Sequence, residues 1–494
     1  MSSHRTRSGR RAAALGSIAV LTATGCQSYT AAPPALERHL DEWLARSPSA
    51  PAVAAFAQSL RAPPREAARP FDASDGLDAD EAEVVALVFN GELRRARLAT
   101  GLTLAGVDHA GAWSDPTLGV DIAKIVSSSA EPWKLFGSLG LTLPLSGRLE
   151  LERTQAGRDH AVARARLAAA EWRTRMEVRR ALAEREAASR RATVTHEAVA
   201  ALAEIIVVVD RMEQAGDLTR AEARLFRIEQ ATLMARAAQL SAELQRTHHA
   251  VRRLLGLAPS AELPLASEGA LAPPHAEEAP ANDAATALAN DGSANDSGLR
   301  RHPALVLAQA EHEAAEAALE LEIRRQYPDL ELAPGLGRED GLDQVLLGLS
   351  LPLPLFERNR RAIAEATARR ALTGAEVALA LEQLLDARHA AETELAAARA
   401  QRVAIEEGLV PLADQQFADA RHLAGLGELH ALVLLDSLAR QREAKLQLID
   451  AALAETRAAI DRHEVVHAPP LHAGDHAIES ATETTTDDEP RSSR

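Results

Sequence analysis

Four histidines near the C-terminus are the residues whose type and spacing could hold a metal ion. They are His463, His467, His472 and His476. Imidazole nitrogens are good ligands for Zn²⁺ and Cu²⁺, so transient binding of such an ion is one interpretation. The other is an ordinary solvated tail, because the segment after Val466 has the composition of a disordered chain end. The methionines are scattered between Met1 and Met234, which does not suit a copper relay.

No arrangement typical of an enzyme occurs in the 494 residues. The sequence lacks a Ser-His-Asp set, a glycine-rich phosphate loop and a compact group of carboxylates, so neither catalysis nor a cofactor is expected. Cys26 is the one cysteine, which excludes an intrachain disulfide and a thiolate metal cage. The net charge of −16 argues against a nucleic-acid-binding protein, which needs a basic surface.

The N-terminus has the pattern of a secretory signal peptide. Four arginines precede the short apolar run "AAALGSIAVL", and "TATGC" follows it. Cys26 comes directly after Gly25, as in a bacterial lipobox in which the cysteine becomes the lipidated first residue, although Ala23 replaces the usual leucine. Gln27 resembles a signal for sorting to an outer membrane. The alternative is an ordinary signal peptide with an incidental cysteine.

Long helices are expected over most of the chain. Aromatic residues make up only 3% of the chain, while Ala, Leu, Glu and Arg are abundant. Residues 148–215 contain no proline and would extend about 100 Å as one helix. Residues 357–424 form a second such stretch, in which Pro411 should kink the helix. Helices of this length must pack along their sides as coiled coils.

No window offers about 18 consecutive apolar residues, the length of a spanning helix. The longest aliphatic run, "IIVVV" at residues 205–209, is far too short. Any membrane crossing is therefore expected to use β-strands.

An internal duplication organises the chain. The phrase "LGLTLPL" at residues 139–145 returns as "LGLSLPL" at residues 347–353. Three further landmarks recur in the same order at nearly the same offset: Leu93 and Leu305, Pro116 and Pro328, and Gly216-Asp217-Leu218 and Gly427-Glu428-Leu429. The chain is therefore predicted to contain two tandem copies of one unit. Each copy should begin with a helical stretch, over about residues 81–112 and 304–326, and continue with two short strands and long helices.

Each repeated phrase alternates with a period of two. In the first copy Leu139, Leu141 and Leu143 share one face of the strand, while Gly140 and Thr142 share the other. The preceding segment alternates in the same way, with Leu118, Val120 and Ile122 opposite Thr117, Gly119 and Asp121. One aliphatic and one polar face is typical of a membrane β-barrel strand, and the alternative is a half-buried sheet in a soluble α+β protein. Four strands cannot close a wide barrel alone, so the membrane interpretation requires an oligomer.

Several motifs resemble the outer-membrane factor family of TolC-like efflux channels. The resemblance covers residues 80–258 and 300–465, and it is strongest in "LPLPLFERNRRAIAEA" at residues 351–366, which is similar to the heavy-metal cation-efflux branch. The family's paired "NPEL" and "NPTL" motifs correspond to "NGEL" and "DPTL" in the first copy, and to "HPAL" and "YPDL" in the second. Asn90-Gly91 departs from the usual Asn-Pro.

The resemblance implies a mainly α fold with a small β part, built from long coiled-coil helical hairpins and two β-hairpins per chain. Three chains would form a shared twelve-stranded β-barrel and an α-barrel across the periplasm. The homotrimer would be a passive outer-membrane exit duct for heavy-metal cations or other small toxic solutes. A periplasmic adaptor would connect it to an inner-membrane pump.

The resemblance also assigns roles to particular residues. The helical tips that meet the adaptor would be Gly216, Asp217 and Leu218 in the first copy and Gly427, Glu428 and Leu429 in the second. The family often has two acidic pore residues three positions apart after the second tip, which correspond here to Val433 and Asp436. Asp121, Asp329 and Glu331 would line the barrel lumen. The alternatives are a solvated helix position for Asp436 and solvated loop ends for the lumen residues.

The sequence predicts a domain organisation, and it leaves two alternatives to the function of an efflux channel. This organisation comprises a signal peptide (1–25), a lipidated linker or equatorial segment (26–80), the first repeat (81–258), an acidic connector rich in proline and alanine (259–300), the second repeat (301–465) and a disordered tail (466–494). One alternative is a periplasmic coiled-coil scaffold without a channel, which would not need two copies of a two-faced β-hairpin. Another is a silent member of the channel family, which the loss of a carboxylate at Val433 permits.

Overall fold

A computed structural model describes residues 29–60, 71–124, 126, 133–266, 299–339, 342–425 and 431–466. The chain divides into two compact units, residues 1–45 and 46–494. In the first unit the described residues contain the helix α2 (Leu36–Leu44). The signal peptide, Cys26, the second tip at Gly427, Glu428 and Leu429, and the histidines beyond Val466 lie outside the described residues.

In the second unit a helix, two strands and long helices follow one another twice, as the duplication predicts, and among the described residues only the first series has two additional helices before this pattern. The first series is α3 (Pro51–Ser59), α4 (Ala79–Phe89), α5 (Gly91–His109), β1 (Thr117–Lys124), β2 (Trp133–Leu143), α6 (Arg148–Ala215) and α7 (Arg220–Leu254). The second series is α10 (Pro303–Arg324), β3 (Leu330–Glu339), β4 (Leu342–Ser350), α11 (Arg360–Ala404), the π-helical turn η1 (Ile405–Leu409), α12 (Val410–Gly425) and α13 (Ala431–Val466).

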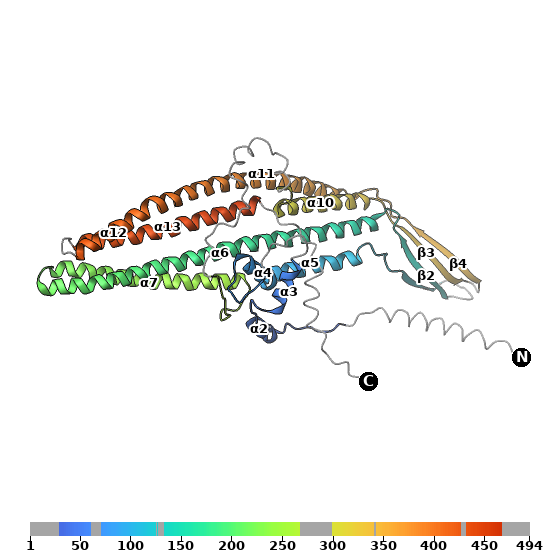
Figure 1. Cartoon of the computed structure of the whole chain (residues 1–494). Helices are drawn as coiled ribbons and strands as arrows, with labels where there is room; N and C mark the ends of the chain where they lie inside the picture. Colours follow the sequence, from blue (N-terminus) through green and yellow to red (C-terminus); the bar gives the residue numbers. More distant parts are fainter. Residues whose placement is uncertain are drawn as a thin grey trace, which may run out of the picture. The chain divides into compact units, whose positions relative to one another are not determined.

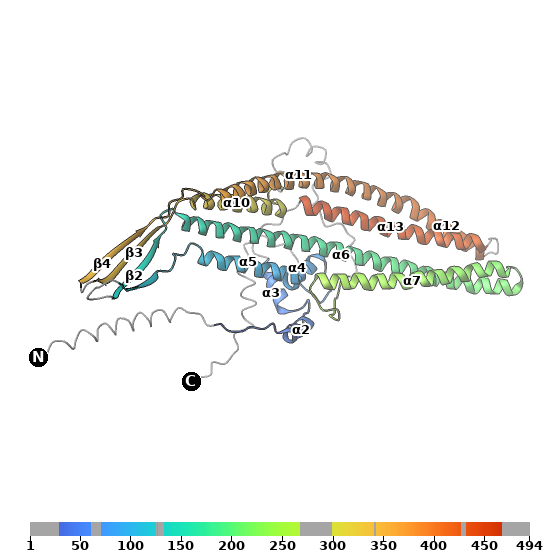
Figure 2. The same ribbon diagram turned by 180° about the vertical axis from the view of Figure 1, so that it is seen from behind.

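The four strands form one antiparallel sheet in the order β1-β2-β3-β4. Each copy thus supplies one hairpin, and β2 and β3 join the two hairpins edge to edge. Within residues 46–494 the sheet lies at one end of the long helices, and the helical pairs α6–α7 and α12–α13 reach the opposite end (Figures 1 and 2). The duplicated phrase recurs because each copy contributes its own hairpin to the same sheet.

The helical stretch expected over residues 81–112 consists of two helices, because Asn90 ends α4 and caps α5. Its side-chain Oδ1 accepts hydrogen bonds from the backbone N–H groups of Glu92 (2.9 Å) and Leu93 (3.2 Å). Its Nδ2 donates to the carbonyl oxygen of Leu254, the last residue of α7, at 2.9 Å. Asn90 therefore ties the start of α5 to the end of α7.

His302 makes the corresponding connection in the second copy. Its Nδ1 accepts from the backbone N–H of Ala304 at 3.2 Å, and so caps α10. Its Nε2 lies 3.1 Å from the carbonyl oxygen of Glu464 near the end of α13. The first residue of "NGEL" and of "HPAL" thus has one structural role in the two copies.

The entry into each long helix is also equivalent. Gly147 precedes α6 with a φ of 74°, and Asn359 precedes α11 with a φ of 52°. This left-handed conformation suits glycine and is tolerated by asparagine. Asn359 belongs to the "FERNR" motif, and its Nδ2 donates to the carbonyl oxygen of Glu322 at the end of α10 (2.8 Å). The motif thereby anchors α11 to α10.

The helix lengths agree with the sequence prediction. α6 spans the predicted 68 residues without a break. The second stretch begins at Arg360 and is interrupted by η1 just before Pro411. Proline lacks the N–H group that an α-helix would use and its ring crowds the preceding turn, so the π-helical turn accommodates it.

The described residues contain five apolar clusters of buried side chains, and the two largest lie at different places along the helices. One joins α3, α4, α6 and α7, and it includes the fully buried Val53, Val85 and Leu255. The start of the predicted connector belongs to this cluster, since Leu263 is buried and Leu265 pairs with Leu77. The other cluster, near the helical tips, packs α6, α7 and α13 around Phe226 and Leu438.

One described helix is long and apolar enough to cross a membrane by length and composition, and it is α6. This corrects the expectation that no helix would qualify. Only 33% of the apolar window is buried within the chain. α6 nevertheless has a packing role, because its Leu202 and Val209 belong with Phe226 to the cluster near the tips.

Candidate functional site

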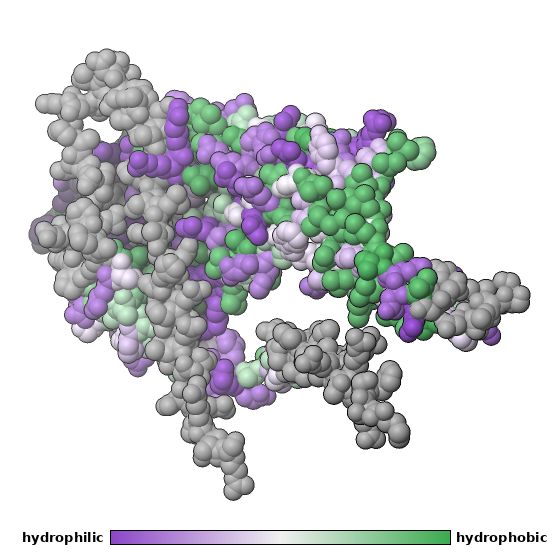
Figure 3. Space-filling model, turned by 90° about the vertical axis from the view of Figure 1, so that its right-hand side faces the viewer, coloured by the Kyte–Doolittle hydropathy of each residue, from purple (hydrophilic) through white to green (hydrophobic). Residues whose placement is uncertain are grey.

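The sheet has one aliphatic face and one polar face. The register places Leu118, Leu139 and Leu135 on the same side, together with Leu336 and Leu347 of the second hairpin. These side chains are exposed, with 75% of Leu347 accessible. The opposite side presents mainly glycine and polar side chains. The predicted alternation is therefore present in all four strands, and Figure 3 shows a broad hydrophobic surface at the end that carries the sheet.

Exposed aromatic residues flank this sheet. Trp113 precedes β1, Tyr327 precedes β3 and Phe356 follows β4, all at the helix side, whereas Trp133 begins β2 at the opposite end. The chain has only 13 aromatic residues, so four exposed ones around four strands are a concentration. Trp and Tyr prefer the two interfaces of a membrane. Aromatic residues that border the β segments are a signal visible in the sequence, but the predictions above did not include them.

The height of the aliphatic face matches a bilayer. β2 has 11 residues, and at about 3.3 Å per step its first and last Cα atoms are roughly 33 Å apart. A tilt of about 40° reduces this to roughly 25 Å, the height of the apolar band of outer-membrane barrels.

The three predicted lumen residues lie in different settings. Asp121 is exposed on the polar face of β1 and is paired in register with Phe136. Glu331 is exposed on the same face, in register with Thr142 and Ser350. Asp329 precedes β3, and its Oδ2 accepts from Arg148 Nε at 2.9 Å. Only the first two carboxylates therefore face the space beside the strands, whereas Asp329 joins the start of α6 to the second copy.

The first helical tip is a tight, fully capped turn. Gly216 has a φ of 85°, and the N–H of Asp217 donates to the carbonyl oxygen of Met212 at 2.9 Å. Thr219 and Glu222 then form a capping box at the start of α7. Asp217 is exposed, while Leu218 packs against the cluster near the tips. The turn thus presents the exposed Asp217 carboxylate between two hydrogen-bonded helix ends.

Val433 and Asp436 both lie near the start of α13. Val433 is 45% exposed, and the carboxylate of Asp436 is bound to Arg440 one turn later, with 2.7 Å between Oδ2 and Nε. The pairing partly neutralises the carboxylate. The described residues contain no group of three or more His, Cys, Asp or Glu side chains that could hold a metal ion.

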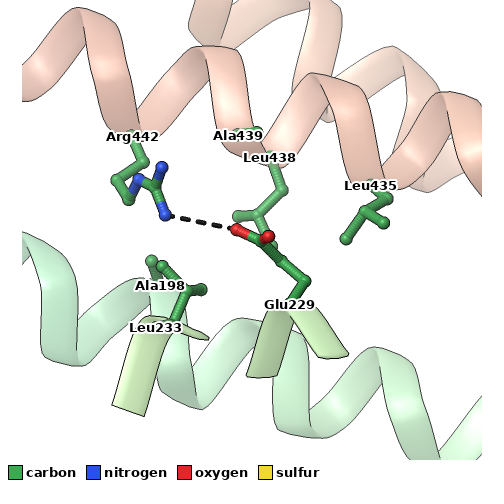
Figure 4. Close-up of a pocket in the computed structure, with 7 residues that line it drawn as sticks. All are labelled: Ala198, Glu229, Leu233, Leu435, Leu438, Ala439 and Arg442. Atoms are coloured by element: carbon green, nitrogen blue, oxygen red, sulfur yellow. Dashed lines mark hydrogen bonds and ion pairs between the residues drawn. The ribbon is translucent and has the colours of Figure 1, made fainter. Parts of the chain in front are cut away.

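A small cavity lies between the two helical hairpins near their tips. Ala198 of α6, Leu233 and Glu229 of α7, and Leu438 and Arg442 of α13 surround it (Figure 4). Glu229 Oε1 lies 3.5 Å from Arg442 Nη1, which gives an ion pair between α7 and α13. These residues could not be predicted from the sequence, because partners 213 positions apart show no local pattern. The cavity is too small for cargo, and it marks where one hairpin contacts the other.

Comparisons with known proteins agree with this architecture. No family model matches the chain. The cobalt-zinc-cadmium resistance protein CzcC of Cupriavidus metallidurans is 25% identical over 246 residues, which are 48% of this chain and 54% of the relative. The match thus spans about half the length of that curated relative.

Several solved structures share the fold, among them two outer-membrane proteins. The outer membrane protein VceC of Vibrio cholerae gives a TM-score of 0.65 at 18% identity, with coverage of 80% of this chain and 97% of VceC. The CmeC outer membrane channel of Campylobacter jejuni gives a TM-score of 0.65 at 12% identity, with coverage of 85% and 94%. The chain has the fold of these outer-membrane proteins, which confirms the fold that the resemblance implies.

Proposed function

We propose that this chain is the outer-membrane channel subunit of a tripartite efflux system. The observation that carries the proposal is the sheet, whose aliphatic face is exposed and bordered by Trp113, Tyr327, Phe356 and Trp133. An exposed apolar face of this size is unfavourable in water and favourable in lipid. The polar face would then border an aqueous lumen.

The sheet requires partners if it spans a membrane. β1 and β4 each have one edge without a strand partner among the described residues, and an open edge is not tolerated in lipid. Because the four strands alternate in direction, β4 of one copy can pair antiparallel with β1 of the next. Three copies would close a twelve-stranded barrel, so we propose a homotrimer with outer-membrane lipid around it and lipidated Cys26 as an additional anchor.

The long helices would extend from the barrel into the periplasm. α6, at about 1.5 Å per residue, is about 100 Å long, which suits a conduit. The tip at Gly216, Asp217 and Leu218, with its counterpart at residues 427–429, would meet a periplasmic adaptor, and an inner-membrane pump would supply the energy. Val433 and Asp436 would border the narrow end of the conduit, and Asp121 and Glu331 its lumen.

Heavy-metal cations are the proposed cargo. CzcC supports this choice because its name records cobalt, zinc and cadmium resistance. The cations would pass as substrate, and selection would lie with the pump and the adaptor. Passive conduction needs neither a resident cofactor nor catalytic groups, which agrees with the absence of an enzyme-like motif in the sequence.

Adjacent leucines on β4 test the membrane assignment. Leu347 is on the aliphatic face, in register with Pro334, and Leu346 is on the other face, in register with Gly335. Leu347→Arg should cost roughly 2–4 kcal/mol if the side chain lies near the middle of the bilayer. Leu346→Arg places the same charge toward water and should be tolerated.

The measurement is the amount of heat-sensitive trimer in the outer-membrane fraction of a Gram-negative host expressing the full chain. We expect the trimer to be lost for Leu347→Arg and retained for Leu346→Arg. Equal trimer for both variants would contradict the lipid-facing assignment. A soluble wild-type monomer or dimer in the periplasm would instead favour the coiled-coil scaffold.

A further inference from the structure

Two cationic residues interrupt the aliphatic face at the end of the sheet farthest from the helices. Lys124 ends β1 and is in register with Trp133, and Arg338 is in register with Leu135 two residues farther along β2. The Lys124 Nζ atom lies 5.3 Å from the centre of the Trp133 ring, a cation–π contact. We refer to Lys124, Trp133 and Arg338 as the distal cationic cluster.

The neighbours of this cluster are aliphatic and exposed. Ile122 and Leu336 lie one step closer to the helices on the same face, and each is nearly 70% accessible. A cation on such a face is costly within hydrocarbon, but at the edge of the apolar band it meets lipid headgroups. Trp133 beside Lys124 indicates the same level, because tryptophan concentrates at membrane interfaces.

We propose that the distal cationic cluster binds the phosphate groups of lipid in the outer leaflet of the outer membrane. The inference rests on the proposed function, which directs this end of the sheet outward because the helices occupy the other end (Figure 1). The outer leaflet of a Gram-negative bacterium carries a phosphorylated glycolipid, so the ligand is a phosphorylated sugar headgroup on the outside of the barrel.

The spacing suits such a headgroup. Lys124 and Arg338 are two strands and two residues apart, which places their Cα atoms roughly 12 Å from each other. Both side chains are long enough to approach one headgroup with two phosphates from either side. Asp343 is the acidic neighbour on this face. Its Oδ1 lies 3.9 Å from Arg338 Nε, and its side chain is 90% exposed, so it can turn away from an approaching phosphate.

Lys134 provides a matched control. It is next to Trp133 on β2 and at the same end of the sheet, but its register with Ala123 places it on the polar face. A lipid on the outside of the barrel should not reach it. Lys134→Gln therefore removes one positive charge at the same height without touching the proposed site.

The experiment measures lipid binding to the full-length trimer purified from outer membranes and placed in nanodiscs or detergent. Native mass spectrometry would count bound bis-phosphorylated lipid A and, separately, its dephosphorylated form. At about 1 kcal/mol for each cation near a charged membrane surface, the double variant Lys124→Gln/Arg338→Gln should bind the phosphorylated lipid about 30-fold more weakly. Lys134→Gln should bind it like the wild type, and added inorganic phosphate should not compete at concentrations comparable to the lipid.

Several results would overturn the inference. These are equal binding by wild type and double variant, an equal loss in Lys134→Gln, equal binding of dephosphorylated lipid, or efficient competition by inorganic phosphate. The proposed function is judged separately by the trimer in the outer-membrane fraction. If the wild type forms no such trimer, both proposals fall, whereas a normal trimer without selective lipid binding refutes only the distal cationic cluster.

Discussion

His302 makes a helix cap that should weaken in acid, whereas Asn90 makes the equivalent cap without a titratable group. The His302 side chain is 7% exposed, and burial lowers its pKa below the usual value, with a smaller opposing effect from Glu464. In the neutral ring Nδ1 accepts from the backbone of Ala304, and Nε2 is left to donate to the carbonyl oxygen of Glu464. That oxygen also accepts from Trp172 Nε1 at 3.0 Å.

Protonation removes the acceptor and therefore the cap. Because the folded-state pKa of His302 is depressed, its contribution to stability is fully present above the unfolded-state pKa of about 6.5. It is lost as the pH falls from that value through the folded-state pKa. An N-cap contributes about 1 kcal/mol, which corresponds to about a fivefold change in the equilibrium for local opening of α10.

Hydrogen exchange of the first turn of α10 measures this opening directly. After correction for the intrinsic exchange rate, lowering the pH from about 7.5 to a value below the depressed folded-state pKa of His302 should speed exchange about fivefold in the wild type. His302→Asn retains a cap like that of Asn90 and should show no such change. Arg180 binds the carboxylates of Asp461 and Glu464. These ion pairs are present in both proteins, so their effect on the exchange rate cancels in the comparison. An equal pH effect in wild type and His302→Asn would refute the reasoning.

Five further substitutions, at four positions, test contacts within and between elements. Leu438→Ala should destabilise the packing of α13 against α6 and α7 by about 2–5 kcal/mol, whereas Arg442→Met should cost no more than about 1 kcal/mol because its ion pair with Glu229 is partly exposed. Thermal unfolding of the purified protein gives both values, and the opposite ranking would show that the ion pair holds the hairpins together. Asn90→Ala should cost about 2 kcal/mol, since it removes the cap of α5 and leaves the Leu254 carbonyl without this donor. Asn90→Asp should recover only the cap, and a full recovery in the same unfolding assay would exclude a role for the bond to Leu254. Pro411→Ala restores a backbone N–H beside η1 and should raise the free energy of unfolding by about 1–3 kcal/mol. An unchanged melting temperature would mean that other contacts maintain the π-helical turn.

Local periodicity explains why much of the architecture could be predicted. The alternation of leucines with glycine, serine and threonine assigned the two faces of β2 and β4, and the register confirms it. The absence of proline over residues 148–215 predicted α6 to its last residue. These features depend on neighbours two to four positions apart, and such neighbours determine strand faces and helix continuity.

Contacts between distant residues decided the remaining features. The break at Asn90 depends in part on Leu254, and the position of Asp329 depends on Arg148. The apolar stretch of α6 acquires its packing role only when Phe226 lies beside it. By itself the sequence determined two tandem copies, their long helices and the two-faced strands, because each is a repeated local pattern. Which polar side chains cap, pair or remain exposed was decided by the tertiary structure, since their partners come from other elements of the chain.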